Sequence, residues 1–238
     1  MAAMQPPAKR CRTEDLDGAG PVIPCTPGEA LAATPAMLRR MLDVIELEVL
    51  PKTERGVALG NKVFGAAILD ARASSEAASS SLLPTVIAET NHETLCPLYH
   101  GEVYTIKQWS ESLPPDKRPC PAESLFLSTH EPCCMCISAI VWAGFKKVFY
   151  LFPYESTRDQ GIPHDIDIMQ ELWQVPRYAQ RNKFCSLAGL LDLIAGCPPE
   201  DQVEFSETVD RITSRYEVLA RRYHAEKSSN PKNTLAFD

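Results

Sequence analysis

The segment 124–142 constrains the fold more than any other part of the chain. A short apolar run ends at Ser128, a turn containing Pro132 follows, and a mostly apolar stretch of helical length begins at Cys133. Cys133 and Cys136 therefore fall on the first turn of a predicted helix, where their sulfurs converge on one side. The exposed amides of such a turn favour thiolates over thiols. This pattern predicts a metal site where a strand passes into a helix.

A catalytic zinc needs one more protein ligand and an open fourth position for water. His100 is the best candidate, because Glu102 follows it closely and can place a carboxylate beside that water without binding the metal. We therefore predict one zinc per chain, held by His100, Cys133 and Cys136, with Glu102 as the catalytic residue that moves protons. The backbone amide of Cys133 is a candidate for stabilising the oxyanion, although it can equally be an ordinary amide at a helix start.

Two other kinds of site also use a Cys-x-x-Cys pair. A structural zinc would need a fourth protein ligand, for which Cys134, Cys120, Cys96 and His130 are the candidates. A redox dithiol would leave the His-Gly-Glu triplet unexplained. In the zinc interpretation His130 is expected to be a partly exposed loop residue, and Cys134 is expected to pack into the helix and sheet.

Strands and helices alternate along most of the chain, which predicts an α/β sandwich. The first helix begins after Thr34 and is expected to end at Pro51. From about Pro163 onward the apolar spacing predicts helices only. The predicted strands are 63–69, 85–89, 124–128 and 147–152, and the other well-defined helices are 100–113 and 133–142.

Composition suggests where the chain is found and what it binds. No run of eighteen uncharged apolar residues occurs, and residues 1–20 contain no apolar signal core, so we expect a cytoplasmic protein without a membrane span. Lys9, Arg10 and Arg12 make nuclear targeting the alternative. The net charge of −7 gives no overall attraction to nucleic acid. Of nine cysteines, three are crowded at 133–136, which favours reduced thiols and a metal over disulfides.

The metal-binding residues carry a family resemblance. A His-x-Glu motif followed by Pro-Cys-x-x-Cys is the signature of zinc deaminases, so the chain resembles the cytidine deaminase superfamily. The resemblance covers roughly residues 37–173. It implies a three-layer α/β/α sandwich with a central five-stranded mixed sheet, and usually a homodimer. The residues that match the family's longer motif are Thr129, Glu131, Pro132, Cys133, Met135, Cys136 and Ala139.

With this resemblance the chain divides into four parts. They are a disordered leader (1–30), a zinc-dependent deaminase domain (31–175), a helical C-terminal extension (176–228) and a flexible tail (229–238).

The resemblance also implies a set of substrate-binding residues. Asn91 is placed like the family's base-binding asparagine, although a turn asparagine is the alternative. Phe64, Ala66, Gly101 and Glu131 are expected around the base, and core packing explains the first two almost as well.

Other residues are expected to have structural roles. His164 and Asp165 can cover the pocket as a lid, but capping of the next helix by Asp165 is the simpler account. Trp109, Trp142 and Trp173 are expected in the core.

The implied activity is hydrolytic deamination of an amino-substituted nucleobase, with release of ammonia. The triplet His100-Gly101-Glu102 is like that of yeast cytosine deaminase, whereas guanine and tRNA adenosine deaminases generally have alanine in the middle. The segment 154–173, by contrast, looks more like guanine deaminases. Free cytosine, converted to uracil, is therefore the first choice and guanine the second.

Two further functions stay open. A tRNA adenosine deaminase needs a basic patch near the pocket, and the available cations are too scattered along the sequence to require one. These cations are Lys52, Arg55, Lys62, Lys107, Arg158 and Arg177. The non-enzyme alternative is an inactive scaffold subunit with the deaminase fold. Retention of Glu102 argues against it, because a scaffold has no need of a proton carrier.

Overall fold

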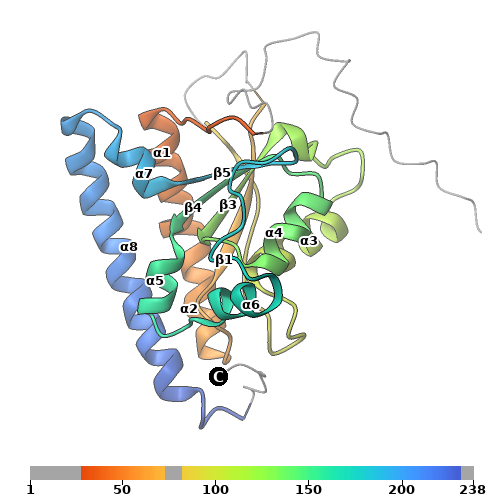
Figure 1. Cartoon of the computed structure of the whole chain (residues 1–238), viewed down its shortest axis with the longest axis vertical. Coiled ribbons are helices and arrows are strands. Elements are labelled where there is room, and N and C mark those ends of the chain that lie inside the picture. Colours follow the sequence, from red (N-terminus) through yellow and green to blue (C-terminus); the bar gives the residue numbers. More distant parts are fainter. Residues whose placement is uncertain (1–27, 73–81, 232–238) are drawn as a thin grey trace, which may run out of the picture.

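The computed structural model describes residues 28–72 and 82–231, and its centre is a five-stranded mixed sheet with the order β2-β1-β3-β4-β5 (Figure 1). β1 pairs antiparallel with both β2 and β3, whereas β3, β4 and β5 run parallel to one another. The strands are β1 (Gly65–Asp70), β2 (Thr85–Thr90), β3 (Ser124–His130), β4 (Lys147–Phe152) and β5 (Ser186–Gly189).

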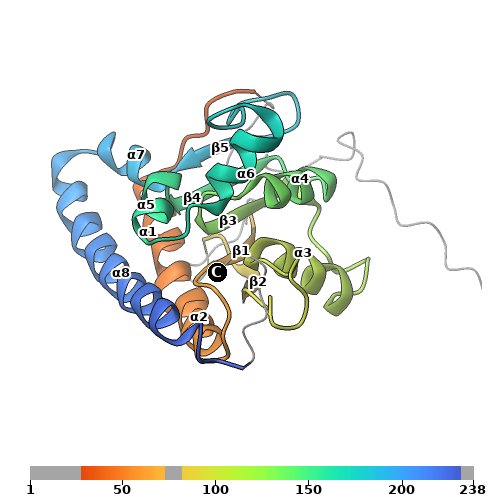
Figure 2. The same cartoon turned by 60° about the horizontal axis from the view of Figure 1, so that its bottom comes forward.

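Helices cover both faces of this sheet, which confirms the predicted three-layer α/β/α sandwich (Figure 2). One layer contains α1 (Pro35–Asp43), the π-helix η1 (Val44–Val49), α2 (Leu50–Ala58), α7 (Leu190–Ala195) and α8 (Pro199–Glu226). The opposite layer contains α3 (Gly101–Ser112) and α4 (Cys134–Trp142). The remaining helices are η2 (Pro121–Glu123), α5 (Tyr154–Asp159) and α6 (His164–Trp173).

The central strands β3 and β4 are buried at every position. A strand covered on both faces needs apolar or hydrogen-bonded side chains throughout, which explains the nearly continuous apolar run at 147–152. Leu127 and Phe149 face the layer of α1 and α8, while Phe126 and Val148 face α3 and α4. Two separate cores therefore hold the sheet from its two sides.

The sequence predicted that the first helix ends at Pro51, but in the structure the helical segment continues past it. The chain passes from α1 through the wider π-helical turn of η1 into α2, and Pro51 lies in the first turn of α2. Proline is tolerated there because a first-turn residue has no need of a backbone donor, and the wide turn makes room for its ring. The prediction was wrong because it treated proline only as a stop signal.

The C-terminal region also differs from the prediction. Residues 187–194 were assigned to a helix, but the first of them form β5, which pairs with β4. Beyond it, α8 buries Ile212, Tyr216 and Tyr223 against the same core as α1. The predicted helical C-terminal region is present as α7 and α8, which follow β5. The domain boundary between 175 and 176 stays a prediction.

Some predictions concern residues that the structure does not describe. Residues 1–27 of the leader, which include Lys9, Arg10 and Arg12, and residues 232–238 of the tail lie outside the described residues. Within 28–72 and 82–231, no helix combines the length and apolar character that a membrane span requires.

One edge of the sheet gathers the residues singled out by the sequence. The carboxyl ends of β2, β3 and β4 meet the amino end of β1 at this edge, because β1 runs antiparallel to its neighbours. The connection after β2 leads to α3, and the connection after β3 leads to α4. Both helices therefore begin at the same place.

Candidate active site

The starts of α3 and α4 bring three metal-ligand side chains together. His100 is the residue before α3, Cys133 is the residue before α4, and Cys136 lies in the first turn of α4. One ligand atom from each residue lies within 4.8 Å of the other two. The Cys133 Sγ is 3.6 Å from the His100 Nδ1, so the ring turns its Nδ1 toward the thiols.

This donor set fits zinc, with two sulfurs and one imidazole nitrogen and room for a fourth, non-protein ligand. Within the described residues, no fourth His, Cys, Asp or Glu belongs to the group. Cys96, Cys134 and His130, considered as the fourth ligand of a structural zinc, are therefore not part of it. All three cysteines of the 133–136 segment are free thiols, whereas Cys120 is disulfide-bonded, contrary to the expectation of reduced cysteines throughout.

The charges in the group support metal binding. A hydrogen bond with Cys136 lowers the pKa of Cys133 well below its ordinary range. Burial alone lowers the pKa of His100, but the Cys133 thiolate and the carboxylates of Glu93 and Glu102 outweigh it and raise that pKa to about 9. The site is thus an electronegative cluster that a divalent cation neutralises.

Glu102 lies beside the metal ligands and is only 4 % exposed. Its carboxylate accepts a hydrogen bond of 2.9 Å from the Ser128 hydroxyl, which fixes the side chain. Burial, and then the negative charge of Cys133, raises the pKa of Glu102 above its ordinary value. A carboxyl group whose pKa is raised above its ordinary value holds a proton more readily, which suits a group that must both accept and return one in general acid–base catalysis.

A cavity of about 500 Å³ opens in front of the metal ligands. His100 and Cys133 line it, and Phe64 lies in its wall as predicted. Much of the rest of the wall is apolar and comes from α6 and the segment before α3. These wall residues include Leu98, Ile168, Leu172 and Trp173.

The segment that begins at His164 forms part of this cavity. Both His164 and Asp165 line it, and α6 begins after Pro163 without a side-chain capping bond. The capping role that the sequence favoured for Asp165 is therefore wrong, and the position over the pocket is correct. Trp173 is half-exposed at the same cavity and Trp142 is 90 % exposed, so only Trp109 lies in the core as expected.

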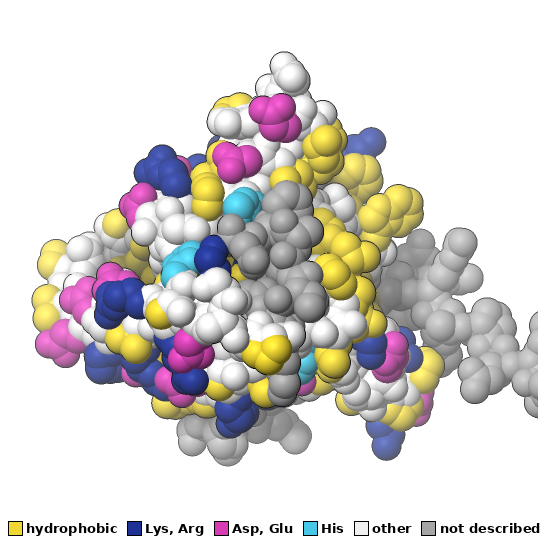
Figure 3. All heavy atoms as spheres, turned by 90° about the horizontal axis from the view of Figure 1, so that it is seen from below, with side chains coloured by type: hydrophobic (Ala, Val, Ile, Leu, Met, Phe, Trp, Pro, Cys, Tyr) yellow, Lys and Arg dark blue, Asp and Glu magenta, His cyan; other side chains and the backbone are white. Residues whose placement is uncertain are grey.

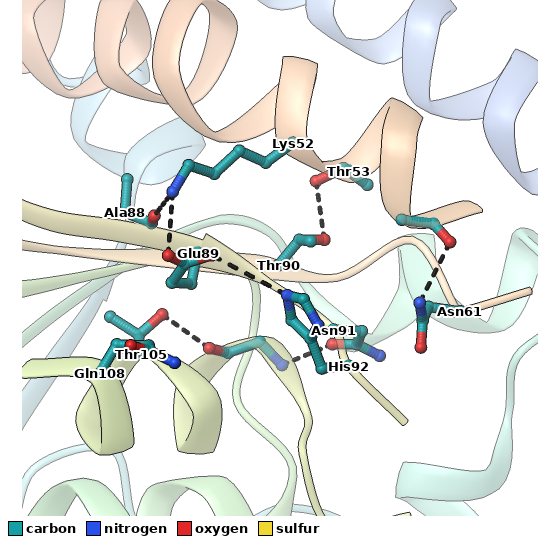
Figure 4. Close-up of polar contacts among 12 residues, drawn as sticks. Lys52, Thr53, Asn61, Ala88, Glu89, Thr90, Asn91, His92, Thr105 and Gln108 are labelled. Carbon is teal, nitrogen blue, oxygen red and sulfur yellow. Dashed lines mark hydrogen bonds and ion pairs between the residues drawn. The ribbon is translucent and has the colours of Figure 1, made fainter. Parts of the chain in front are cut away.

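Asn91 is buried at the end of β2 and its side-chain amide has two protein partners. Figure 4 shows one of them, the contact with the start of α3. Its Oδ1 accepts a hydrogen bond from the Gly101 amide, and its Nδ2 donates to Glu93 at 2.7 Å. Asn91 is not among the residues that line the cavity. Its contact with a substrate therefore stays a prediction.

Two other predicted substrate residues lie away from the cavity. Ala66 is buried in the core between the sheet and α3. The Glu131 carboxylate binds the guanidinium of Arg177 at 3.0 Å and the amide of Gln180 at 3.0 Å. Glu131 thus joins the segment after α6 to the end of β3. It is not among the residues that line the cavity, and its contact with a substrate stays a prediction.

His130 is also placed differently from the prediction. It is buried at the end of β3, where its ring contacts Phe64, Phe152 and Tyr216. Burial lowers the pKa of His130 to about 3, so the ring is neutral near pH 7. It is a core residue and not an exposed loop residue.

Two further residues that line the cavity are Lys62, which the sequence indicated only as one of six scattered cations, and Glu93, which no sequence pattern singled out. Glu93 was treated as part of a turn that follows β2. Their ion pair joins the loop before β1 to the loop after β2, at the open end of this hairpin, a contact that no local pattern indicates.

Gly101 has a packing role. A Cβ atom at this position would lie 2.7 Å from the Gly65 Cα and 2.9 Å from its backbone nitrogen. The start of α3 therefore lies directly on the start of β1, and neither backbone can move freely because Gly65 is itself enclosed by Val49 and Glu89. The glycine of the His-Gly-Glu triplet is explained by this contact, without reference to the substrate.

We expect Gly101→Ala to lower the free energy of unfolding by about 1–3 kcal/mol, as overpacking of a tight contact does. Urea denaturation measures the change. Gly196→Ala is the matched control, because its nearest Cβ contact would be an ordinary 3.5 Å and its stability should change little. Equal stability of the two variants would contradict the packing explanation.

Comparison with known proteins places the metal-binding segment in a family. The model of the cytidine and deoxycytidylate deaminase zinc-binding region matches residues 48–152. This range contains His100, Glu102 and both zinc-binding cysteines. No curated protein sequence matches the chain.

Solved structures with similarity to the chain include two guanine deaminases and a tRNA deaminase. The guanine deaminase from Nitrosomonas europaea has 15% identity and a TM-score of 0.43, over 83% of this chain and 87% of that chain. The guanine deaminase from Bacillus subtilis has 20% identity and a TM-score of 0.39, over 74% and 92%. A tRNA deaminase of wobble-position A-to-I editing has 20% identity and a TM-score of 0.34, over 48% and 77%. Scores this low decide nothing about the substrate.

Proposed function

The chain belongs to the cytidine deaminase superfamily, and from this we propose that it is a zinc-dependent hydrolytic deaminase of a free nucleobase. The observation that carries the proposal is the buried carboxylate of Glu102 beside a group of three zinc ligands at an open cavity. A structural zinc site requires neither the cavity nor the carboxylate, whereas a hydrolase requires both. The reaction replaces the exocyclic C–N bond of the base by a carbonyl and releases ammonia.

Zinc, when bound, supplies the Lewis acid that makes water a nucleophile near neutral pH. Glu102 accepts the proton of the attacking water and passes it to the ring nitrogen next to the reacting carbon. It then moves a second proton to the amino group, which leaves as ammonia. Ser128 holds the carboxylate through these transfers. The backbone amide of Cys133 is proposed to stabilise the oxygen that becomes the carbonyl.

The volume and the apolar lining of the cavity support a two-ring base over a one-ring base. Its volume of about 500 Å³ is within the ordinary range for small-molecule sites, and α6 adds a broad apolar wall with Trp173. A second aromatic ring can fill this wall, whereas a pyrimidine leaves much of it uncovered. Cytosine was preferred on the sequence because of Gly101, which packing now explains. We therefore propose guanine ahead of cytosine.

Five of the six cations that the sequence offered for tRNA binding are paired with carboxylates, and of the six only Lys62 lines the cavity; Arg55 has no ion pair among the described residues. Lys52, Lys107 and Arg158 each form an ion pair with a neighbouring carboxylate. Lys62 and Arg177 are likewise paired. Figure 3 shows basic and acidic side chains mixed on one face of the molecule, without a continuous basic stripe. A polyanion would have to displace these carboxylates before it gained contacts of its own.

We propose that Asn91 fixes the orientation of the base, because its side chain contacts the first residue of α3, Gly101, which lies between His100 and Glu102. We expect Asn91→Ala to raise KM and lower kcat with the correct base. Steady-state kinetics measures both, and zinc content measured in parallel shows whether the metal site is intact. An unchanged kcat/KM would leave Asn91 with a structural role only.

An ammonia-release screen tests the proposed function. The purified chain with one zinc bound is incubated with guanine, cytosine, adenine, their nucleosides and a tRNA anticodon stem-loop. Release from guanine or cytosine supports a nucleobase deaminase and identifies which base is used. Release only from the stem-loop would replace the proposal by tRNA editing. No release from any of them would favour the inactive scaffold. Sedimentation in the same buffer tests the homodimer that the resemblance implied.

A further inference from the structure

The His100 ring has its two nitrogens in contrasting surroundings. Its Nδ1 faces the Cys133 sulfur at 3.6 Å, on the side of the metal ligands. Its Nε2 faces the opposite way, 3.7 Å from the Oε1 of Glu93. A histidine that binds a metal through Nδ1 must carry its proton on Nε2. The carboxylate that this proton needs as a partner is therefore already in place.

Glu93 is held in this position by residues other than His100. Its Oε2 accepts hydrogen bonds from the Lys62 backbone amide at 3.1 Å and from the Asn91 amide at 2.7 Å. Its Oε1 accepts one from the Lys62 ammonium at 3.3 Å. With a side chain that is 2 % exposed, the carboxylate cannot swing away from the imidazole. Its position is thus set before any metal binds.

A buried carboxylate of this kind is costly to retain. The desolvation free energy of a buried charge is offset only where the ion-pair geometry is good and further hydrogen bonds satisfy the group. Apolar residues in place of Lys62 and Glu93 would close the same gap between the two loops without that cost. Loop packing alone therefore does not explain why Lys62 and Glu93 are charged. The contact between Glu93 and His100 does explain the carboxylate.

We propose that Glu93 is a positioning residue for zinc: its carboxylate lies 3.7 Å from the His100 Nε2 and accepts a hydrogen bond from the Nε2–H when the ring binds zinc, which fixes the neutral tautomer and the direction of Nδ1. Partners of this kind orient metal-binding histidines and increase their basicity. Lys62 and Asn91 act one step further out, because they hold the carboxylate. The inference rests on the zinc site of the proposed function, but it does not depend on which base is the substrate.

The test measures the zinc affinity of Glu93→Gln by competition with a chelator, in the full chain and without substrate. We expect an affinity about 10–100-fold lower than that of the wild type, the usual effect of losing such a partner. Cobalt bound in place of zinc should show an altered visible spectrum in the same variant. Glu89→Gln is the matched control. It removes the carboxylate of Glu89, which lies in β2 four residues before Glu93 and pairs with Lys52 at 3.0 Å (Figure 4). Its zinc affinity should stay within about twofold of the wild type, far from the loss expected for a metal partner.

A double variant separates positioning from charge. Glu93→Gln alone leaves the Lys62 ammonium buried without its partner, which destabilises the fold and repels a cation. Lys62→Met with Glu93→Gln removes both charges, so its thermal midpoint should recover while its zinc affinity stays low. Recovered affinity in the double variant, or wild-type affinity in Glu93→Gln, would overturn the proposal. None of these measurements depends on ammonia release. The zinc affinities can therefore be interpreted even if the activity screen detects no substrate.

Discussion

Glu102→Gln is expected to lower kcat by about 10²–10⁴-fold, the range that a positioned proton carrier contributes. Glutamine has the size of glutamate and can accept the same hydrogen bond from Ser128, so the change removes the proton transfer and little else. Because the same carboxylate serves every proton transfer of the proposed reaction, we expect the upper part of this range. Single-turnover ammonia release with the base found in the screen measures the effect.

Two controls accompany this variant. Zinc content should equal that of the wild type, since Glu102 is not part of the ligand group. The thermal midpoint should be equal or higher, because burial disfavours the charged carboxylate, as its raised pKa shows. A variant that binds zinc, folds normally and still releases ammonia at the wild-type rate would remove the proposed mechanism.

Cys136→Ala is expected to lose both zinc and activity. Cys136 is fully buried in the first turn of α4, and two remaining ligands cannot hold a catalytic zinc firmly. Metal analysis should give one zinc per chain for the wild type and almost none for the variant. Chelation of the wild type should abolish ammonia release, and added zinc should restore it.

Cys134→Ala is the matched control for this experiment. Cys134 lies in the same turn and is a free thiol, but it does not belong to the ligand group. Its variant should keep one zinc per chain. Equal zinc loss from the two variants would contradict the ligand assignment, as would full activity of the chelated wild type.

The metal ligands could be predicted because their signal is local. Cys133 and Cys136 are one helical turn apart, and a strand followed by a proline turn and a helix is visible in twenty residues of sequence. His100 is distant in the chain, and its assignment as third ligand rested on its neighbour Glu102 and on a known motif. The structure brings all three within 4.8 Å because α3 and α4 begin at the same edge of the sheet.

The errors arose where one local pattern is compatible with two structures. The run at 186–189 is too short to distinguish a strand from a helix, and it became β5 because β4 offered a free edge for pairing. Pro51 stops an ordinary helix but not one that contains a π-helical turn. His130 appeared exposed because it lies within a motif that forms a turn, whereas β3 extends through it into the core.

The sequence by itself indicated the α/β architecture through periodicity, and Cys133 and Cys136 as metal ligands through their short spacing. The choice of His100 as third ligand, and of Glu102 as the predicted proton carrier, also needed a known motif. Only the tertiary structure decided the wall of the cavity from α6, the contact between Gly65 and Gly101, and the carboxylate of Glu93 behind His100. These features join segments that are far apart in the chain, and their existence depends on how closely the layers pack. The order of residues in the sequence does not indicate how far apart such segments lie in the folded protein.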